Sequence, residues 1–134
     1  AKKFDGNLDC IFIDYIQYMK GMSTYETFAE TVKGLKPLAK DNNIHVVALS
    51  QLNRESKPWD KPDMGKLKGG GDLEASADEI LLMWRPGLDP MLVPEEMAMK
   101  KNVVMLSVGK ARHGSQIEEI EMVLDKSISR IKMP

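Results

Sequence analysis

The chain has 134 residues, of which 43% are hydrophobic and 29% are charged, and its formal net charge is −1. These values are typical of one globular domain, or a piece of one, and they exclude a disordered chain. They also exclude an overall positive charge that would attract nucleic acid to the whole molecule. The single cysteine, Cys10, indicates a reduced, cytosolic setting without a disulfide, and no apolar run has the length of a membrane span.

Two apolar stretches in the first half of the chain predict buried strands. Residues 8–16 are apolar apart from two aspartates, and residues 44–52 form a second run of the same kind. Continuous apolar runs of this length are typical of parallel strands that are buried on both faces. A strand–helix–strand unit in one sheet implies a right-handed parallel crossover.

The segment between these strands has the spacing of apolar residues that predicts a helix. Ser23 or Thr24 can cap its start, and the pattern runs to about Asp41. We expect Pro37 to kink or break the last turn, because proline lacks the amide hydrogen that this turn would use.

After residue 52 the composition changes abruptly. Residues 53–71 form a long basic connection rich in glycine and proline, and residues 86–101 form an insert rich in methionine. A connection as long as residues 53–71 in a compact domain is usually functional or mobile. Turn signals and alternation predict the remaining elements: a short helix capped by Asp72 (73–77), a strand (79–84), an antiparallel hairpin (103–112 and 116–124, turning at His113-Gly114) and a last strand (128–131).

Each of the first two strands ends on a polar side chain, Asp14 in one and Gln51 in the other. Ligands of open α/β sheets bind outside the carboxyl ends of the strands, so the pair indicates one edge of a nucleotide site. Asp14 could hold the water shell of a phosphate-bound Mg²⁺, and Gln51 could contact the γ-phosphate or the attacking water. The alternative for Asp14 is an aspartate that only caps a helix or faces a loop. The alternative for Gln51 is an amide that only forms hydrogen bonds with nearby backbone groups. No Gly-x-x-x-x-Gly-Lys-Ser/Thr phosphate loop occurs in the chain.

Two cations lie near the predicted hairpin tip. Lys110 and Arg112 are two residues apart on a strand, so they point the same way. A hairpin tip can project them beyond the domain, where Arg112 could reach a phosphate in the site of a neighbouring subunit. The alternative is a solvated basic tip without a ligand.

The segment Lys66 to Gly71 is a second basic candidate. Its glycines, Gly69, Gly70 and Gly71, expose backbone amides, and Lys66 and Lys68 add charge. Such a loop could follow a phosphodiester backbone without reading bases, or it could be only a flexible hinge. His45 and His113 lack further ligands at metal-binding spacing, and Cys10 has the pattern of a core residue.

Four segments, read in order, closely resemble the DnaB family of replicative helicases, in the carboxyl-terminal half of its RecA-like motor domain. They are Ile11–Met19, Ala48–Arg54, Leu67–Asp78 and Gly109–Gly114. The strings Asp-Tyr-x-Gln-x-Met and Ser-Gln-Leu-Asn-Arg are specific, and the resemblance spans nearly the whole chain, with 86–101 its weakest part.

The resemblance implies a role for each candidate residue. Asp14 matches the Walker B aspartate and Gln51 the glutamine sensor. Lys110 matches the sensor lysine, and Arg112 the arginine finger that acts on the ATP of the adjacent subunit. The segment around Lys68 to Gly71 matches a loop that lines a central channel and grips single-stranded DNA. Family members commonly carry Arg-Glu-Ser-Gly there, which leaves side-chain contacts from this loop open.

The implied fold is α/β, part of a RecA-like P-loop NTPase sheet with parallel strands and a crossover helix, ending in an antiparallel β-hairpin and without the phosphate-loop strand. The family's phosphate loop and water-activating glutamate lie upstream of residue 1, so we expect the chain alone to be inactive. The missing strand belongs between the strands 44–52 and 79–84. These two could pair directly, another chain could fill the gap, or the strand belongs to a larger parent.

The implied parent protein is a homo-hexameric ring that works in the cytoplasm. It would come from a bacterium, a phage or a mobile element, and it would have no membrane partner. It would use ATP and Mg²⁺ to translocate on single-stranded DNA and unwind duplex, with primase and a helicase loader as partners. Two alternatives stay open: a RecA-type ATPase of recombination or signalling, and a non-catalytic module for DNA binding or assembly.

Overall fold

The computed structural model describes residues 8–19, 24–67, 70–114 and 119–134. The chain divides into two compact units: the first unit contains Ala1–Gln51 and Leu67–Ala77, and the second contains Leu52–Lys66 and Asp78–Pro134. No helix among the described residues is both long enough and apolar enough to span a bilayer.

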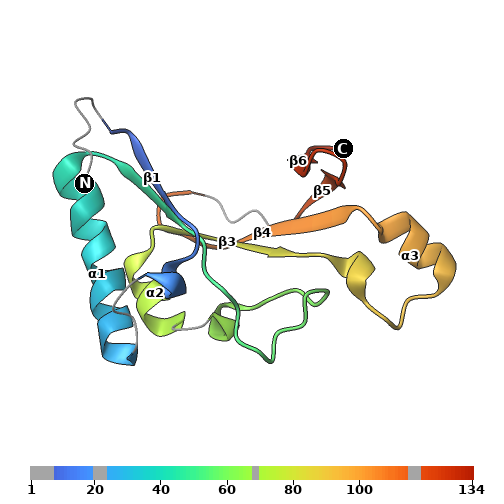
Figure 1. The fold of residues 1–134 in the computed structure, drawn as a ribbon, viewed down its shortest axis with the longest axis horizontal. Coiled ribbons are helices and arrows are strands. Elements are labelled where there is room, and N and C mark those ends of the chain that lie inside the picture. Colours follow the sequence, from blue (N-terminus) through green and yellow to red (C-terminus); the bar gives the residue numbers. More distant parts are fainter. Residues whose placement is uncertain (1–7, 20–23, 68–69, 115–118) are drawn as a thin grey trace. The chain divides into compact units, whose positions relative to one another are not determined.

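The first unit contains the predicted strand–helix–strand. Strands β1 (Cys10–Ile13) and β2 (His45–Ala48) pair in parallel, with Cys10 opposite His45 and Ile13 opposite Ala48. Helix α1 (Tyr25–Asn42) connects them, and the short helix α2 (Gly70–Ser76) packs beside α1 (Figure 1). The parallel pairing confirms the prediction, although both strands are shorter than the apolar runs that contain them.

Helix α1 begins at the predicted cap. The Thr24 hydroxyl accepts the backbone N–H of Thr27, and the Thr27 side chain accepts the N–H of Thr24 in return. The prediction that Pro37 breaks the last turn is wrong, because the helix continues through Pro37 to Asn42. Its final turn gains a further bond from the Asn42 side-chain amide, which donates to the Leu38 carbonyl at 2.9 Å and offsets the bond that proline forgoes.

The core of the first unit lies on one face of the two strands. It consists of Ile16, Phe28 and Val32, and partly buried residues pack against it, among them Leu73 of α2. The other face is open, since Phe12 is 76% exposed. The prediction that both strands are buried on both faces is therefore wrong for this structure, because α1 and α2 supply apolar side chains to one face only.

The second unit is an antiparallel sheet with the strand order β3-β4-β5-β6. Its most deeply buried side chains, Leu82, Trp84, Val104 and Ser107, come from the first two of these strands. The predicted insert 86–101 contains two helical segments. The elements are η2 (Met64–Lys66), β3 (Glu79–Trp84), η3 (Pro86–Leu88), α3 (Pro94–Lys100), β4 (Val103–Ala111), β5 (Ile120–Asp125) and β6 (Arg130–Lys132).

The predicted antiparallel hairpin is confirmed, but its two strands pair over a shorter stretch than we expected. β4 pairs with β5 only over Val103–Leu106, and most of β4, as far as Ala111, pairs with β3. His113-Gly114 is therefore not a tight hairpin turn, and β4 passes from one neighbour to the other along its length. A long strand has hydrogen-bonding groups on both edges, so it can satisfy two partners in this way.

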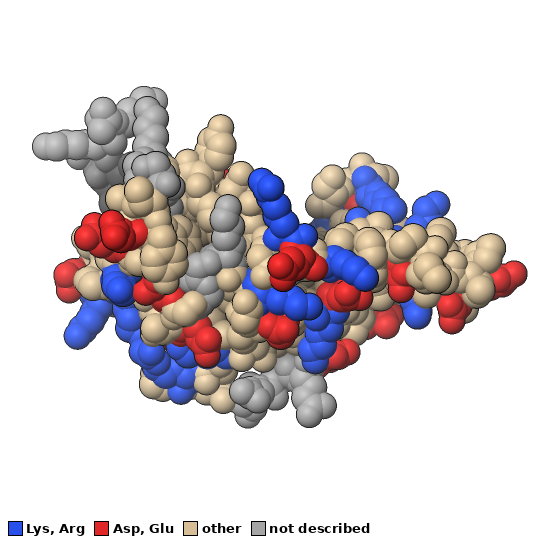
Figure 2. Space-filling view, turned by 90° about the horizontal axis from the view of Figure 1, so that it is seen from below, with Lys and Arg blue, Asp and Glu red and all other residues tan. Residues whose placement is uncertain are grey.

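The described strands form two sheets, one in each unit. Among the described residues β2 pairs only with β1, and β3 only with β4, in two separate sheets. Which of the three expected outcomes holds for the position between β2 and β3 stays a prediction. Figure 2 shows that Lys and Arg side chains are interspersed with Asp and Glu on the face in view, in keeping with the net charge of −1.

Candidate functional site

Asp14 and Gln51 leave the first sheet at the same end. Ile13 is in register with Ala48, and the strands are parallel, so the residues that follow each strand lie at one edge. The pairing continues past the strands, because Leu49 N–H donates to the Ile13 carbonyl at 2.9 Å. This edge is the carboxyl end of the strands, where ligands of α/β sheets bind.

The Asp14 carboxylate is exposed at this edge. It makes no hydrogen bond or ion pair with any residue that the structure describes. The peptide bond between Asp14 and Tyr15 is cis. An accessible carboxylate without a protein partner fits an ion such as Mg²⁺, which keeps several waters and takes few protein ligands. Within the described residues no group of three His, Cys, Asp or Glu side chains could hold a metal by itself.

Sequence reasoning missed Gln17 as a member of this edge. Its side-chain Nε2 donates to Ser50 Oγ at 2.8 Å, and its Oε1 accepts from the Gln51 N–H at 3.3 Å. The signal was present in the sequence, because Gln17 and Ser50 are polar residues close to the two strand ends. The pattern gave no reason to pair them.

Lys110 and Arg112 belong to the second unit. Lys110 lies in β4 opposite Ile80 of β3, and the backbone N–H of Arg112 donates to the Asp78 carbonyl at 2.9 Å. The Arg112 guanidinium also lies 3.1 Å from the Asp78 carboxylate. Lys110 and the backbone of Arg112 are thus held beside β3, and the action of the two side chains on the site of a neighbouring subunit stays a prediction.

The predicted DNA-binding loop is only partly described. Lys66 ends the short helix η2, and its backbone N–H donates to Asp63 Oδ1 at 3.1 Å. Lys68 and Gly69 lie outside the described residues. Gly70 and Gly71 begin helix α2 and are not part of an extended loop, so the predicted loop 53–71 ends earlier than we expected.

Asp72 connects α2 to α1. The Tyr25 hydroxyl donates to Asp72 Oδ2 at 2.7 Å, and Lys33 Nζ lies 3.3 Å from Oδ1. The hydrogen bond from Tyr25, together with that from Lys33, lowers the pKa of Asp72, and the same bond to Asp72 and its negative charge raise the pKa of Tyr25. This network ties α1 to the helix that begins within the predicted DNA-binding segment.

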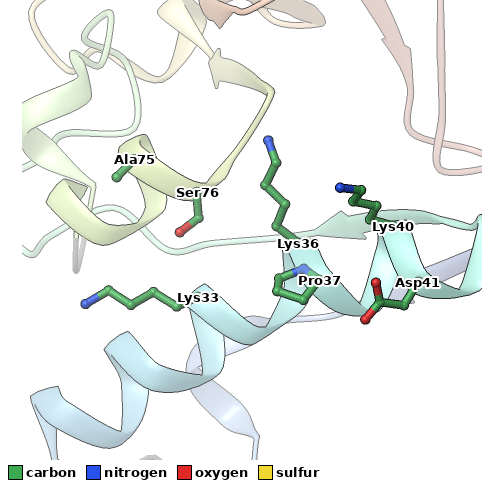
Figure 3. A pocket seen from close by; sticks show the side chains of 7 residues that line it. All are labelled: Lys33, Lys36, Pro37, Lys40, Asp41, Ala75 and Ser76. Carbon is green, nitrogen blue, oxygen red and sulfur yellow. The ribbon is translucent and has the colours of Figure 1, made fainter.

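A pocket of about 500 Å³ lies between α1 and α2, lined mainly by Lys33, Lys36, Lys40 and Asp41 of α1 and by Ala75 and Ser76 of α2 (Figure 3). Figure 3 shows Lys36 extending toward the side on which α2 ends. Asp72 pairs with Lys33 and Asp41 joins the lining, so carboxylates offset part of its positive charge. Its α1 residues lie toward the end of the helix that leads into the start of β2, away from the strand ends that carry Asp14 and Gln51.

Comparison with known proteins decides the family. Residues 1–133 match the sequence profile described as the DnaB-like helicase C terminal domain. The chain belongs to this family. A protein named replicative DNA helicase DnaB from Rickettsia prowazekii is 33% identical over 123 residues, which cover 87% of this chain and 23% of that protein. One of the same name from Pasteurella multocida is 35% identical over 116 residues, or 82% of this chain and 24% of that protein. The chain thus spans about a quarter of the length of these DnaB relatives.

Solved structures agree on the fold. The chain superimposes on one that is described as an ATPase domain with a TM-score of 0.76 and 24% identity, covering 93% of this chain and 44% of that one. A DnaB-like replicative helicase, described with its interactions with primase, gives a TM-score of 0.71 and 26% identity over 87% of this chain and 28% of that one. The RecA-like assignment of the fold is confirmed.

Proposed function

We propose that this chain supplies part of the ATP site of a replicative DNA helicase, in which Mg²⁺-ATP hydrolysis between subunits drives translocation on single-stranded DNA. The observation that carries this proposal is the common edge of Asp14 and Gln51 at the carboxyl ends of paired parallel strands. In the family arrangement the phosphate loop comes from another segment, so this chain contributes one side of the site.

Each residue has a defined part. Asp14 would hold Mg²⁺ through water, and the ion when bound would neutralise charge that develops on the phosphates. Gln51 would orient the attacking water and respond to the loss of the γ-phosphate. Lys110 and Arg112 would act on ATP bound by the neighbouring protomer. Hydrolysis at such a shared site requires assembly, which is the physical reason to propose a homo-hexameric ring.

The segment from Lys66 through Lys68 to Gly71 would contact single-stranded DNA. Lysines and exposed backbone amides attract phosphates without sequence preference. A primase and a helicase loader in the cytoplasm of a bacterial or phage-infected cell would complete the set of partners. The solved DnaB-like helicase that is described with its interactions with primase supports the primase as a partner by similarity.

The test uses the full-length protein that carries this segment, measured for ATP hydrolysis with and without single-stranded DNA. Asp14→Asn should lower kcat by about 10²-fold or more, because the metal loses its charged partner. Asp9→Asn is the matched control, since Asp9 is also exposed but precedes the same strand at its other end. Equal activities of the two variants would contradict the proposed role of Asp14.

A further inference from the structure

Gln17 completes a ring of hydrogen bonds around the peptide groups of Ser50 and Gln51. Its Nε2 donates to Ser50 Oγ at 2.8 Å, and its Oε1 accepts from the Gln51 N–H at 3.3 Å. Ser50 Oγ in turn donates to the Gln51 carbonyl at 3.4 Å. Every donor in the ring faces an acceptor, so these three bonds are mutually compatible.

Chemistry determines which way round the Gln17 amide lies. A backbone N–H can only donate, so the amide oxygen must face Gln51 and the amide nitrogen must face Ser50. The reverse orientation would point the Gln17 NH₂ group at the Gln51 N–H. The hydroxyl of Ser50 can accept from Gln17 and still donate to the Gln51 carbonyl, which no apolar residue at this position could do.

The backbone that carries Gln17 is itself held firmly. Gln17 lies in the short helix η1 (Ile16–Tyr18), directly after Ile16, which is 0% exposed. The N–H of Ile16 donates to the Leu49 carbonyl at 2.9 Å. Gln17 therefore extends from an anchored position on the segment that follows Asp14 to the segment that contains Gln51.

Gln51 depends on this support. Its side chain is exposed and makes no hydrogen bond with the residues that the structure describes. It lies beyond β2, where the regular pairing has ended. The place from which its side chain extends is set by its backbone, and the backbone N–H of Gln51 is held by Gln17.

We propose that Gln17 is a positioning residue, which holds Gln51 at the nucleotide and makes the Asp14 and Gln51 segments respond as one unit. This inference rests on the proposed function. A positioned water or amide that shifts by a fraction of an ångström loses much of its effect on a reaction, so the consequence falls on kcat for hydrolysis. The affinity for ATP is set elsewhere and should change little.

The experiment compares Gln17→Ala, Gln51→Ala and the double variant in the full-length protein, with kcat and KM for DNA-stimulated ATP hydrolysis. Gln17→Ala should lower kcat by roughly tenfold, with KM within about twofold. The double variant should be no slower than Gln51→Ala, because Gln17 acts through Gln51. If the fold-decreases in kcat of the two single variants multiply in the double variant, the inference is overturned.

Asn42→Ala is the matched control. It removes a side-chain amide whose bond to the Leu38 carbonyl is 2.9 Å long, in the same unit but at the far end of α1. Its kcat should equal that of the unaltered protein, and an equal loss in Asn42→Ala and Gln17→Ala would mean a general structural effect. If Gln17→Ala does not fold, Gln17→Glu keeps the acceptor for Gln51 and is judged by the same double-variant criterion.

The outcomes separate this inference from the function on which it rests. If Gln51→Ala lowers kcat and Gln17→Ala does not, Gln17 is not a positioning residue while the proposed ATP site stands. If Gln51→Ala leaves both hydrolysis and its coupling to unwinding unchanged, the proposed function itself is wrong.

Discussion

Arg112 and Asp78 are joined twice, through the backbone N–H of Arg112 to the Asp78 carbonyl at 2.9 Å and through the guanidinium to the carboxylate at 3.1 Å. The two side chains remain 40% and 53% exposed. Exposed ion pairs contribute only about 0.2–1 kcal/mol, so the guanidinium can exchange this carboxylate for a phosphate at small cost. The backbone bond keeps the residue in place during that exchange.

Arg112→Ala should therefore reduce ATP hydrolysis by the full-length protein by about 10³-fold or more, while ATP binding stays within a few-fold. The reason is that the proposed finger would stabilise charge in the transition state at the site of a neighbouring subunit. Arg130→Ala, which removes an exposed arginine of β6, is the control and should hydrolyse ATP normally. Normal hydrolysis by Arg112→Ala would show that the assignment of the finger is wrong.

Lys68→Ala should weaken binding of single-stranded DNA and make it less sensitive to salt. Each phosphate contact releases counterions, so losing one lysine should reduce the slope of log affinity against log salt by about 1. The measurement is a salt titration of DNA affinity. Lys126→Ala removes an exposed lysine from the β5–β6 turn and serves as the control. If both variants keep the same slope, the segment does not contact DNA.

The Tyr25–Asp72 bond makes the stability of the first unit depend on pH at both extremes. The pKa of Asp72 is lowered from 3.8, so its contribution is present above that value and is lost as pH falls through the lower, folded pKa. The pKa of Tyr25 is raised from 10.0, so its contribution is complete below that value and is lost as pH rises through the folded pKa. Tyr25→Phe should remove the alkaline loss, as urea unfolding across the pH range would measure. If Tyr25→Phe loses as much unfolding free energy at alkaline pH as the unaltered protein, the proposed contribution of the Tyr25–Asp72 bond is wrong.

Two glycines should respond oppositely to alanine. A methyl group on Gly34, inside α1, meets no atom within 4 Å, so Gly34→Ala should stabilise the chain by about 0.5–1 kcal/mol through helix propensity. On Gly87 it would lie 2.1 Å from the backbone carbonyl oxygen of Lys100, and backbone cannot yield as a side chain can. Gly87→Ala should cost about 1–3 kcal/mol of unfolding free energy. A neutral Gly87→Ala would mean that η3 does not pack against the end of α3.

Local patterns in the sequence predicted the first unit well. The cap at Thr24, the parallel strands and the common edge of Asp14 and Gln51 follow from signals within a few residues of each feature. The continuity of α1 through Pro37 did not follow, because bonds beyond the proline support the final turn. Burial on one face also depends on which elements are present to cover a strand, and a single strand's composition does not carry that information.

The second unit shows where pattern reasoning failed for a different reason. Alternation predicted strands at 103–112 and 116–124 but could not choose between β3 and β5 as the neighbour of the residues near Lys110. Which strands pair depends on contacts among all the strands of the sheet, and the local sequence of one strand does not contain that information. Gln17 was missed for the same reason, since its role is visible only once Ser50 lies beside it.

Whether Asp14 and Arg112 of neighbouring subunits share one ATP site is tested most directly by mixing two inactive forms of the full-length protein, Asp14→Ala and Arg112→Ala. In a ring with shared sites, about a quarter of the interfaces in a random mixture combine an intact Asp14 with an intact Arg112 from the neighbour. ATP hydrolysis should return on mixing, because these interfaces carry both residues intact. If both forms assemble into joint rings and the mixture stays inactive, the two residues do not meet across a subunit boundary and the account is contradicted.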